Sequence, residues 1–259
     1  MISQRRDGDV AVIEIDRHER RNALDAGHCD TLRAAVREQA ADGARAIVIT
    51  GAGSSFCSGA DLGAAYDAAF RDALYSMLGA ITGARVPVLA AVNGPAIGAG
   101  TQLALACDLR VAAPAAAFSI PTARLGLAVD PWTIRRLAAL AGGGIAQAVL
   151  IGCETLDAGA ALRCGLASRL GDHAVALAWA RELAALAPLS LAYSKQGLNQ
   201  AFELASGSEL ASGSELASGS ELASGSELAK AFEACWASED CAEGQRARAE
   251  KRLPRFQGR

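Results

Sequence analysis

The chain has 259 residues, of which 51% are hydrophobic and 20% are charged, and its mean hydropathy is +0.20. This length suits one α/β domain, or one domain with a helical appendage, and the apolar content allows a large core. The formal net charge of −3 argues against nucleic acid as the main partner, because nucleic-acid-binding domains usually carry a basic excess.

In chain order, the periodicity predicts strands alternating with helices, followed by helices alone. The predicted elements are a strand at 10–15, a helix at 25–41, a strand at 46–50, a helix at 64–82, a strand at 88–92, a glycine loop at 94–100, a helix over 102–106, strands at 109–112 and 117–120, and helices at 134–141, 144–151, 157–164 and 174–186. This order indicates an α/β core with an α-helical end. We place the core at residues 1–195 and a C-terminal helical region at 196–259.

A repeat interrupts the C-terminal region. Residues 203–226 are four tandem copies of E-L-A-S-G-S, and one more E-L-A follows at 227–229. Six residues advance an α-helix by roughly 600°, so the leucines of the repeat do not form one stripe. Serine and glycine at half of the positions weaken a helix further. We expect a solvated, loosely helical excursion.

Cysteine usage and the N-terminus favour a cytosolic protein. The seven cysteines are scattered, with no C-x-x-C pair and no His/Cys cluster, which indicates reduced thiols and no metal site. The first residues reach charges without an apolar core, so we expect no signal peptide. Residues 86–107 are uncharged over a membrane-spanning length, but proline and glycine interrupt them. A buried strand, a loop and a helix are expected there, and no membrane span. The richness in alanine, glycine and arginine is typical of bacteria with high-GC genomes.

Three segments carry the chemical signal: E-R-R-N-A-L-D at residues 19–25, F-C-S-G-A-D-L at 56–62 and N-G-P-A-I-G-A-G-T-Q at 93–102. The third is predicted to be a strand, a glycine turn and the start of a helix. The free N–H groups at such a helix start favour a developing negative charge. A second N–H donor from the region of Gly59 and Ala60 would complete an oxyanion hole for a thioester carbonyl.

In this order and spacing, the three segments resemble the enoyl-CoA hydratase/isomerase (crotonase) superfamily. The resemblance continues in L-G-L at 125–127, A-G-A-A-L-R-C-G-L at 158–166 and E-K-R-L-P-R-F at 250–256, so it covers nearly the whole chain except the repeat. It implies an α/β fold with a ββα spiral core and a C-terminal α-helical region that mediates homotrimers, often paired into hexamers. It also implies an acyl-CoA ligand from fatty-acid metabolism, with coenzyme A as part of the substrate and no tightly bound cofactor.

The resemblance assigns roles to individual residues. The backbone N–H groups of Ala60 and Ala99 would be the oxyanion donors. The remaining contacts to the acyl-CoA are expected from Arg21, Ala23, Leu24, Ser58, Asp61, Leu62, Gln102, Thr122, Trp132, Lys251 and Phe256. Within this set, Trp132 suits the acyl pocket and the plain core equally well, and Asp61 is expected to bond the loop backbone. Lys251 and Phe256 would reach coenzyme A in the same or a neighbouring subunit.

Two positions depart from the family pattern. Family hydratases use two glutamates to activate water and to protonate the α-carbon, and these positions are Gln102 and Thr122 here. An amide is no base near neutral pH, and an unactivated hydroxyl is a poor proton carrier. Each general acid–base contribution is worth about 10²–10⁴ in rate, so the loss of both is expected to abolish nearly all hydratase turnover.

One carboxylate remains a candidate. Asp130 stands where dienoyl-CoA isomerases of the family carry an aspartate, but their second acid corresponds to Thr122. Asp130 could move a proton across an isomerising double bond, or it could cap the helix that begins at Pro131, since Asp before Pro is a common helix start. The two roles are compatible.

Two functions therefore stay open. The protein either binds acyl-CoA without turning it over, or it is an enzyme, an isomerase that uses Asp130 or a slow hydratase. The absent pair of glutamates favours the binding protein. A dinucleotide site at G-A-G-S-S (51–55) lacks its third glycine, and the chain contains neither a P-loop motif nor the G-x-S-x-G motif of α/β-hydrolases.

Overall fold

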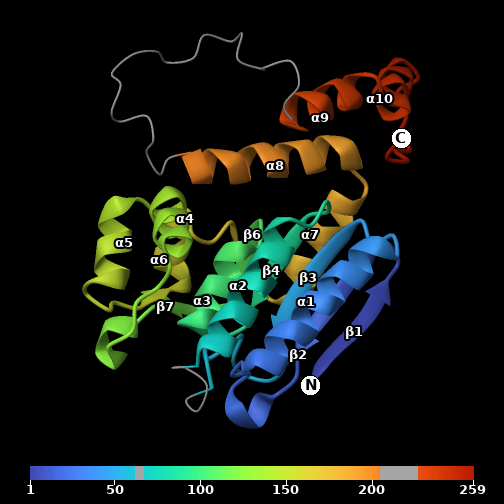
Figure 1. Cartoon of the computed structure of the whole chain (residues 1–259). Helices are drawn as coiled ribbons and strands as arrows, with labels where there is room; N and C mark the ends of the chain where they lie inside the picture. The colour runs from blue at the N-terminus through green and yellow to red at the C-terminus, as the bar shows by residue number, and fades with distance from the viewer. Residues whose placement is uncertain (62–66, 205–226) are drawn as a thin grey trace, which may run out of the picture. The chain divides into compact units, whose positions relative to one another are not determined.

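The computed structural model describes residues 1–61, 67–204 and 227–259, which form two compact units, Met1–Leu183 and Ala184–Arg259 (Figure 1). The predicted boundary after residue 195 falls inside helix α8 (Pro188–Leu204), which belongs to the C-terminal unit. Leu62 and residues 205–226, which hold most of the repeat, lie outside the described residues. The predictions for them therefore stay predictions.

A six-stranded sheet organises the N-terminal unit, in the order β1–β2–β3–β4–β6–β9. The strands are β1 (Ile2–Asp7), β2 (Val10–Ile15), β3 (Ala46–Gly51), β4 (Val88–Val92), β6 (Leu109–Ala112) and β9 (Arg169–Leu170). β1 runs antiparallel to β2, and each of the other neighbouring pairs is parallel. β3 and β4 are buried along their whole length, as expected for apolar strands in a parallel sheet that is covered on both faces.

Helices surround this sheet and a second, smaller one, β5 (Pro95–Ile97), β7 (Ala117–Ser119) and β8 (Leu156–Asp157). The helices of the N-terminal unit are η1 (His18–Arg20), α1 (Ala26–Ala41), α2 (Ala68–Thr82), α3 (Ala99–Ala106), η2 (Thr122–Leu125), α4 (Pro131–Ala141), α5 (Gly143–Leu150), α6 (Ala158–Arg163) and α7 (His173–Ala184). Figure 1 shows α1 and α2 side by side on one face of the large sheet. The predicted loop at 94–100 was wrong in part, because it contains β5.

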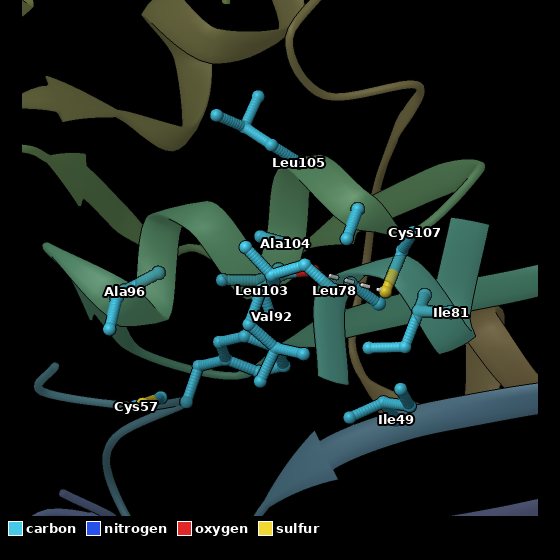
Figure 2. Packing of buried hydrophobic residues seen from close by; sticks show 14 of the residues in the cluster. Ile49, Cys57, Leu78, Ile81, Val92, Ala96, Leu103, Ala104, Leu105 and Cys107 are labelled. Atoms are coloured by element: carbon cyan, nitrogen blue, oxygen red, sulfur yellow. Dashed lines mark hydrogen bonds between the residues drawn. The ribbon is translucent and has the colours of Figure 1, made fainter. Parts of the chain in front are cut away.

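Helix α3 lies at the centre of the core. All of its residues are buried, and Figure 2 shows apolar side chains of β3, β4 and α2 packed around Leu103. At the end of α3, the thiol of Cys107 donates a hydrogen bond to the carbonyl oxygen of Leu103 at 3.4 Å (Figure 2). A helix without a solvent-exposed residue is held on every side, so the position of its N-terminus is fixed by packing.

The C-terminal unit consists of α8, α9 (Glu227–Trp236), α10 (Glu239–Ala249) and a tail. Helices α8 and α9 pack through Tyr193 and Phe232, whose ring centroids are 5.7 Å apart. Asp240 is 4% exposed, and its carboxylate accepts the backbone N–H groups of Gln257 and Gly258 at 2.6 and 2.8 Å, which fixes the tail against α10. Within residues 1–61, 67–204 and 227–259, no single helix is long and apolar enough to cross a membrane, although α7 and α8 meet the length and composition test as a bent pair.

Glu243 of α10 is a second anchor of the tail. Its carboxylate accepts hydrogen bonds from Arg252 and from the backbone N–H of Arg255, and these donors lower its pKa to about 2. A lowered pKa means that the stabilisation is present above the ordinary carboxyl pKa and is lost as the pH falls toward 2.

Glu243→Ala is expected to accelerate hydrogen exchange at the Arg255 amide by roughly tenfold at pH 7, because that amide loses its acceptor. Glu233→Ala, which removes an exposed glutamate of α9, is the matched control and should leave the exchange unchanged. Equal exchange rates in both variants would contradict the anchoring role.

Candidate functional site

A cavity of about 420 Å³ opens in the N-terminal unit. Its walls come from the segment 58–60, helix α2, the start of α3 and residues 121–129. The cavity therefore lies where two of the three sequence segments meet. Most of its lining is apolar, with a few polar side chains, as is usual for small-molecule sites.

The first feature of the site is the backbone around Ala60. Leu24 and Ala60 form a parallel bridge, in which the N–H of Leu24 bonds the Gly59 oxygen at 2.8 Å and the N–H of Asp61 bonds the Leu24 oxygen at 2.7 Å. In such a bridge, Leu24 bonds the residues on either side of Ala60, and the N–H of Ala60 itself points away from Leu24. Gly59 has φ of +100°, and a Cβ there would lie 2.7 Å from the oxygen of Ile97, so this position requires glycine. The N–H of Ala60 thus turns away from Leu24, and Ala60 lines the cavity.

The second feature is the start of α3. Ala99 is its first residue, so its N–H has no acceptor within the helix, and it also lines the cavity. Gly100 lets α3 approach the neighbouring backbone, because a Cβ at this position would lie 2.0 Å from the carbonyl oxygen of Cys57. That oxygen accepts the N–H of Ile97 at 2.9 Å, which ties the segment 57–60 to the start of α3. Ala60 and Ala99, which belong to segments far apart in the sequence, thus line one cavity.

The basic loop is held by Asn22, whose role the sequence did not reveal. Asn22 is fully buried, has φ of +58° and donates from its amide to the oxygens of Ala52 and Ser55. Arg21, also with positive φ, is exposed, and its carbonyl oxygen accepts the N–H of Ser58 at 3.0 Å. An asparagine side chain is the usual non-glycine choice for such a conformation.

Other predicted members of the coenzyme A site have structural roles in the loop. Leu24 is fully buried in the core, so only its backbone can face a ligand. Ala23 is 7% exposed. Asp61 forms an ion pair with Arg17, with 2.9 Å between the carboxylate and Nη2. Ser58 lines the cavity and donates from its hydroxyl to the Arg20 oxygen at 3.3 Å.

Gln102 and Asp130 are linked through Thr133. The Gln102 side chain is 5% exposed in total, and its Nε2 donates to Asp130 Oδ2 at 3.1 Å and to Thr133 Oγ1 at 2.8 Å. The Thr133 hydroxyl in turn donates to Asp130 Oδ2 at 2.6 Å, and the Thr133 N–H donates to Oδ1 at 3.1 Å. Asp130 therefore caps α4, as one of the two interpretations predicted, and three donors satisfy its carboxylate. Asp130 itself is not among the lining residues of the cavity, whereas Gln102 is.

The remaining predicted residues divide between the cavity and other places. Thr122, at the start of η2, lines the cavity. Trp132 does not line it and packs, partly buried, against the hydrophobic core. Lys251 is exposed in the C-terminal unit, and Phe256 lines a separate cavity of about 380 Å³ within that unit.

Three polar residues at the N-cap and in the first turns of α2 line the cavity, and the sequence did not point them out. They are Asp67, Arg71 and Tyr75, spaced four residues apart and therefore on one face of the helix. Asp67 caps α2 by accepting the N–H of Ala69 at 2.9 Å. Burial and the nearby Asp130 charge raise the pKa of Tyr75, so its hydroxyl stays protonated at neutral pH. The available signal was a series of polar residues four positions apart in a largely apolar helix.

Comparisons with known proteins identify the family of the chain. The family model for enoyl-CoA hydratase/isomerase matches residues 5–259. A probable enoyl-CoA hydratase of Mycobacterium leprae, echA6, is 44% identical over 254 residues, which is 96% of this chain and 96% of that protein. The echA6 protein of Mycobacterium bovis, also a probable enoyl-CoA hydratase, is 50% identical over 191 residues, covering 73% of this chain and 79% of that protein.

Solved structures show the same fold. A crystal structure of a putative enoyl-CoA hydratase/isomerase family protein from Hyphomonas neptunium has a TM-score of 0.84 and 30% identity, covering 100% of this chain and 98% of that one. An enoyl-CoA hydratase from Bacillus anthracis has a TM-score of 0.84 and 26% identity, covering 100% and 99%. The chain belongs to the enoyl-CoA hydratase/isomerase family and has the crotonase fold.

Proposed function

We propose that this protein binds acyl-CoA thioesters in the cavity of its N-terminal unit and does not hydrate 2-enoyl-CoA efficiently. The observation that carries the proposal is the combination of two backbone N–H groups, at Ala60 and Ala99, that have no hydrogen-bond acceptor among the described residues, with an amide and a hydroxyl at the two positions where family hydratases carry glutamates. The two N–H groups suit the carbonyl oxygen of a thioester. The amide and the hydroxyl cannot replace the two glutamates as acid and base.

Binding is supported by the direction of the two donors. A thioester carbonyl oxygen placed between the N–H groups of Ala60 and Ala99 would accept two hydrogen bonds, and the dipole of α3 would add to the attraction. These donors belong to the backbone, so they do not depend on side-chain protonation. They can therefore hold a ligand whether or not a reaction follows.

The weak hydratase activity is supported by the chemistry of the lining. Among the cavity-lining residues that the structure describes, Asp67 supplies the one carboxylate, and that group caps α2. Gln102 uses its Nε2 to hold Asp130 and Thr133, and an amide does not accept a proton from water at neutral pH. The described lining residues thus offer no free base for water activation.

An isomerase that uses Asp130 is the second candidate. One observation favours it: Asp130 contacts Gln102 directly and lies beside Tyr75, and both of these residues line the cavity. A proton would still have to reach a carboxylate whose oxygens already accept three hydrogen bonds. Because these three hydrogen bonds occupy the Asp130 carboxylate, its role as the cap of α4 is favoured over a catalytic role.

The test combines calorimetric titration of the full chain with butyryl-CoA and a spectrophotometric assay with crotonyl-CoA and longer 2-enoyl-CoA substrates. We expect binding, and hydration at least 10²-fold slower than in a family hydratase with both glutamates, assayed alongside. Asp130→Asn, which keeps a good helix cap, should leave binding unchanged. Loss of an isomerase activity in Asp130→Asn would favour the second candidate, and rapid hydration by the wild type would refute the proposal.

Further proposals rest on the family resemblance. We propose that Arg21, Ala23, Ser58 and Asp61 border the coenzyme A moiety, with Lys251 and Phe256 reaching it from the same or a neighbouring subunit. We also propose a homotrimer or a dimer of trimers, a cytosolic location, and a place in bacterial fatty-acid metabolism. Sedimentation analysis of the purified protein would test the oligomeric state.

A further inference from the structure

The C-terminal unit contains a cavity of its own, of about 380 Å³. Helices α8, α9 and α10 and the tail residue Phe256 form its walls. It shares no lining residue with the cavity of the N-terminal unit, and apart from Phe256 the function proposed above uses none of its residues. Its volume lies in the usual range for small-molecule sites, so its lining indicates which ligand it would accept.

Four aromatic side chains line this cavity, those of Tyr193, Phe232, Trp236 and Phe256. The centroid of the Phe232 ring is 5.7 Å from that of Tyr193 and 6.2 Å from that of Trp236, and both pairs of rings are tilted. Trp236 is 66% exposed, so a ligand in the cavity can reach its indole ring from solution. The faces of aromatic rings carry partial negative charge and attract cations, above all quaternary ammonium groups.

Asp240 supplies the one charge among the described lining residues. It is 4% exposed, and its two carboxylate oxygens accept the backbone N–H groups of Gln257 and Gly258. These donors are neutral, and the start of α10, where Asp240 lies, adds only the partial charge of the helix dipole. Each carboxylate oxygen can accept a further bond. The buried negative charge therefore has no full countercharge among the described residues.

Glu243, three residues later in the same helix, is a compensated carboxylate in a similar environment. It is 9% exposed, and both of its oxygens pair with the guanidinium group of Arg252. Buried charges in proteins are usually paired in this way, because their separation from water is otherwise costly. Asp240 has no lysine or arginine partner in the part of the chain that the structure describes, so its charge is open to a cation from solution.

The rest of the lining favours an organic cation over a metal ion. Apart from Asp240 and the four aromatic residues, the walls consist of alanine, leucine, glycine, serine and cysteine. Within the described residues, no group of three histidine, cysteine or acidic side chains is placed to hold a metal ion. An alkylated ammonium ion offers alkyl groups to the rings and a positive charge to the carboxylate at the same time.

We propose that the cavity of the C-terminal unit binds a small quaternary ammonium ion, with the aromatic rings around its alkyl groups and the Asp240 carboxylate as its counterion. The aromatic lining and the buried carboxylate are independent observations, and both indicate a cation. The proposal does not depend on the binding of acyl-CoA, because the two cavities share no lining residue.

The test is a titration of the full chain with choline and, separately, with 3,3-dimethyl-1-butanol, in which a carbon atom replaces the charged nitrogen. The methyl resonances of each ligand are followed by NMR at low ionic strength. We expect choline to bind roughly tenfold more tightly than the neutral alcohol, because only choline carries the charge. Vesicles of phosphatidylcholine, whose head group carries the same ion, form a second arm. Co-sedimentation with the vesicles would assign a lipid as the source of the ion, and choline binding without co-sedimentation would assign a free small molecule.

Three variants locate the site. Asp240→Asn should remove most of the preference for choline, because it removes the charge and keeps an acceptor for the tail. Glu233→Gln, which removes the same charge from an exposed residue of α9, is the matched control and should bind choline as the wild type does. Trp236→Leu removes an exposed ring and leaves the hydrogen bonds of Asp240 in place, so it should weaken choline binding roughly threefold.

Equal affinities of the wild type for choline and for the neutral alcohol would overturn the proposal. So would a preference for choline that persists in both Asp240→Asn and Trp236→Leu, since the ion would then be bound elsewhere. If Asp240→Asn fails to fold, Trp236→Leu decides: unchanged choline binding refutes the site, and weakened binding supports it. The proposed acyl-CoA binding is tested separately by butyryl-CoA, so the failure of one proposal is distinguishable from the failure of the other.

Discussion

Replacing Gln102 by glutamate is expected to destabilise the protein by about 3 kcal/mol at pH 7, although glutamate is the residue of family hydratases at this position. The Gln102 amide donates to Asp130 Oδ2 at 3.1 Å and to Thr133 Oγ1 at 2.8 Å. A glutamate would replace these donors by a second carboxylate beside the first, in a place where Gln102 is 5% exposed. For a unit of this size, the loss corresponds to a fall in Tm of roughly 6–12 °C.

The placement of a second carboxylate beside Asp130 also predicts how the stability of Gln102→Glu depends on pH. Two adjacent carboxylates cannot both stay ionised at low cost, so the folded variant would hold a proton that the unfolded chain releases. A carboxyl group whose pKa is raised on folding is compatible with the fold at low pH and costs stability as the pH rises through the normal carboxyl range. The deficit of Gln102→Glu relative to the wild type should therefore be smaller at pH 5 than at pH 8.

Two variants make this prediction specific. Gln102→Met removes the same donors without adding a charge, and we expect it to lose about 1–2 kcal/mol with no such pH dependence. Gln102→Glu combined with Asp130→Asn moves the amide to the other side of the contact, so it should recover most of the lost Tm. Thermal unfolding of the wild type and the three variants at pH 5 and pH 8 measures these differences in stability. Equal losses in Gln102→Glu and Gln102→Met, or no recovery in the double variant, would contradict the role given to the amide.

This coupling links Gln102, one of the two departures from the family pattern, to Asp130. At the sequence level, Gln102 and Asp130 are separate observations, the first a lost base and the second a possible catalyst. In the structure the amide and the carboxylate are hydrogen-bond partners. The exchange of glutamate for glutamine removes a base and at the same time supplies a donor to a neighbouring aspartate. A contact between side chains 28 residues apart is set by tertiary packing, which periodicity does not report.

The fold was predictable where the sequence carries an apolar signal. The buried strands β2 and β4 have the bounds that their β-branched runs predicted. β1 was missed because it is an edge strand whose central residues are exposed, so its sequence, ISQRRD, has no apolar alternation. β8 and β9 have two residues each, too short for any periodicity, and they are defined by their pairing with β7 and β6.

The glycine-containing segments indicated that backbones approach closely near Gly59 and at the start of α3, and the structure has both approaches. The assignment of the oxyanion donors to Ala60 and Ala99 came from the family resemblance and stays a prediction. The contribution of α2 was not predicted, since Tyr75 becomes a cavity residue only when α2 is placed beside α3. For Trp132 the sequence left the acyl pocket and the plain core equally open, and in the structure it packs, partly buried, against the core.

Gly100→Ala is expected to have the other large effect, a loss of about 3 kcal/mol or more, together with at least tenfold weaker acyl-CoA binding. The added Cβ would lie 2.0 Å from the Cys57 carbonyl oxygen, and both groups belong to backbones that cannot rotate away. Separation of the two segments would break the hydrogen bond from the Ile97 N–H to that oxygen and move Ala60 away from Ala99.

The matched control is Gly79→Ala, in the exposed face of α2, where a Cβ would meet nothing within 4 Å. This substitution should stabilise the protein by about 1 kcal/mol, because alanine has the higher helix propensity. Denaturant unfolding and calorimetric titration of both variants measure the two effects. If Gly100→Ala retained normal affinity at a temperature where it is folded, the close approach of α3 to Cys57 would be a matter of packing alone. The spacing of the two N–H donors would then not depend on it, and the thioester would have to be held in another way.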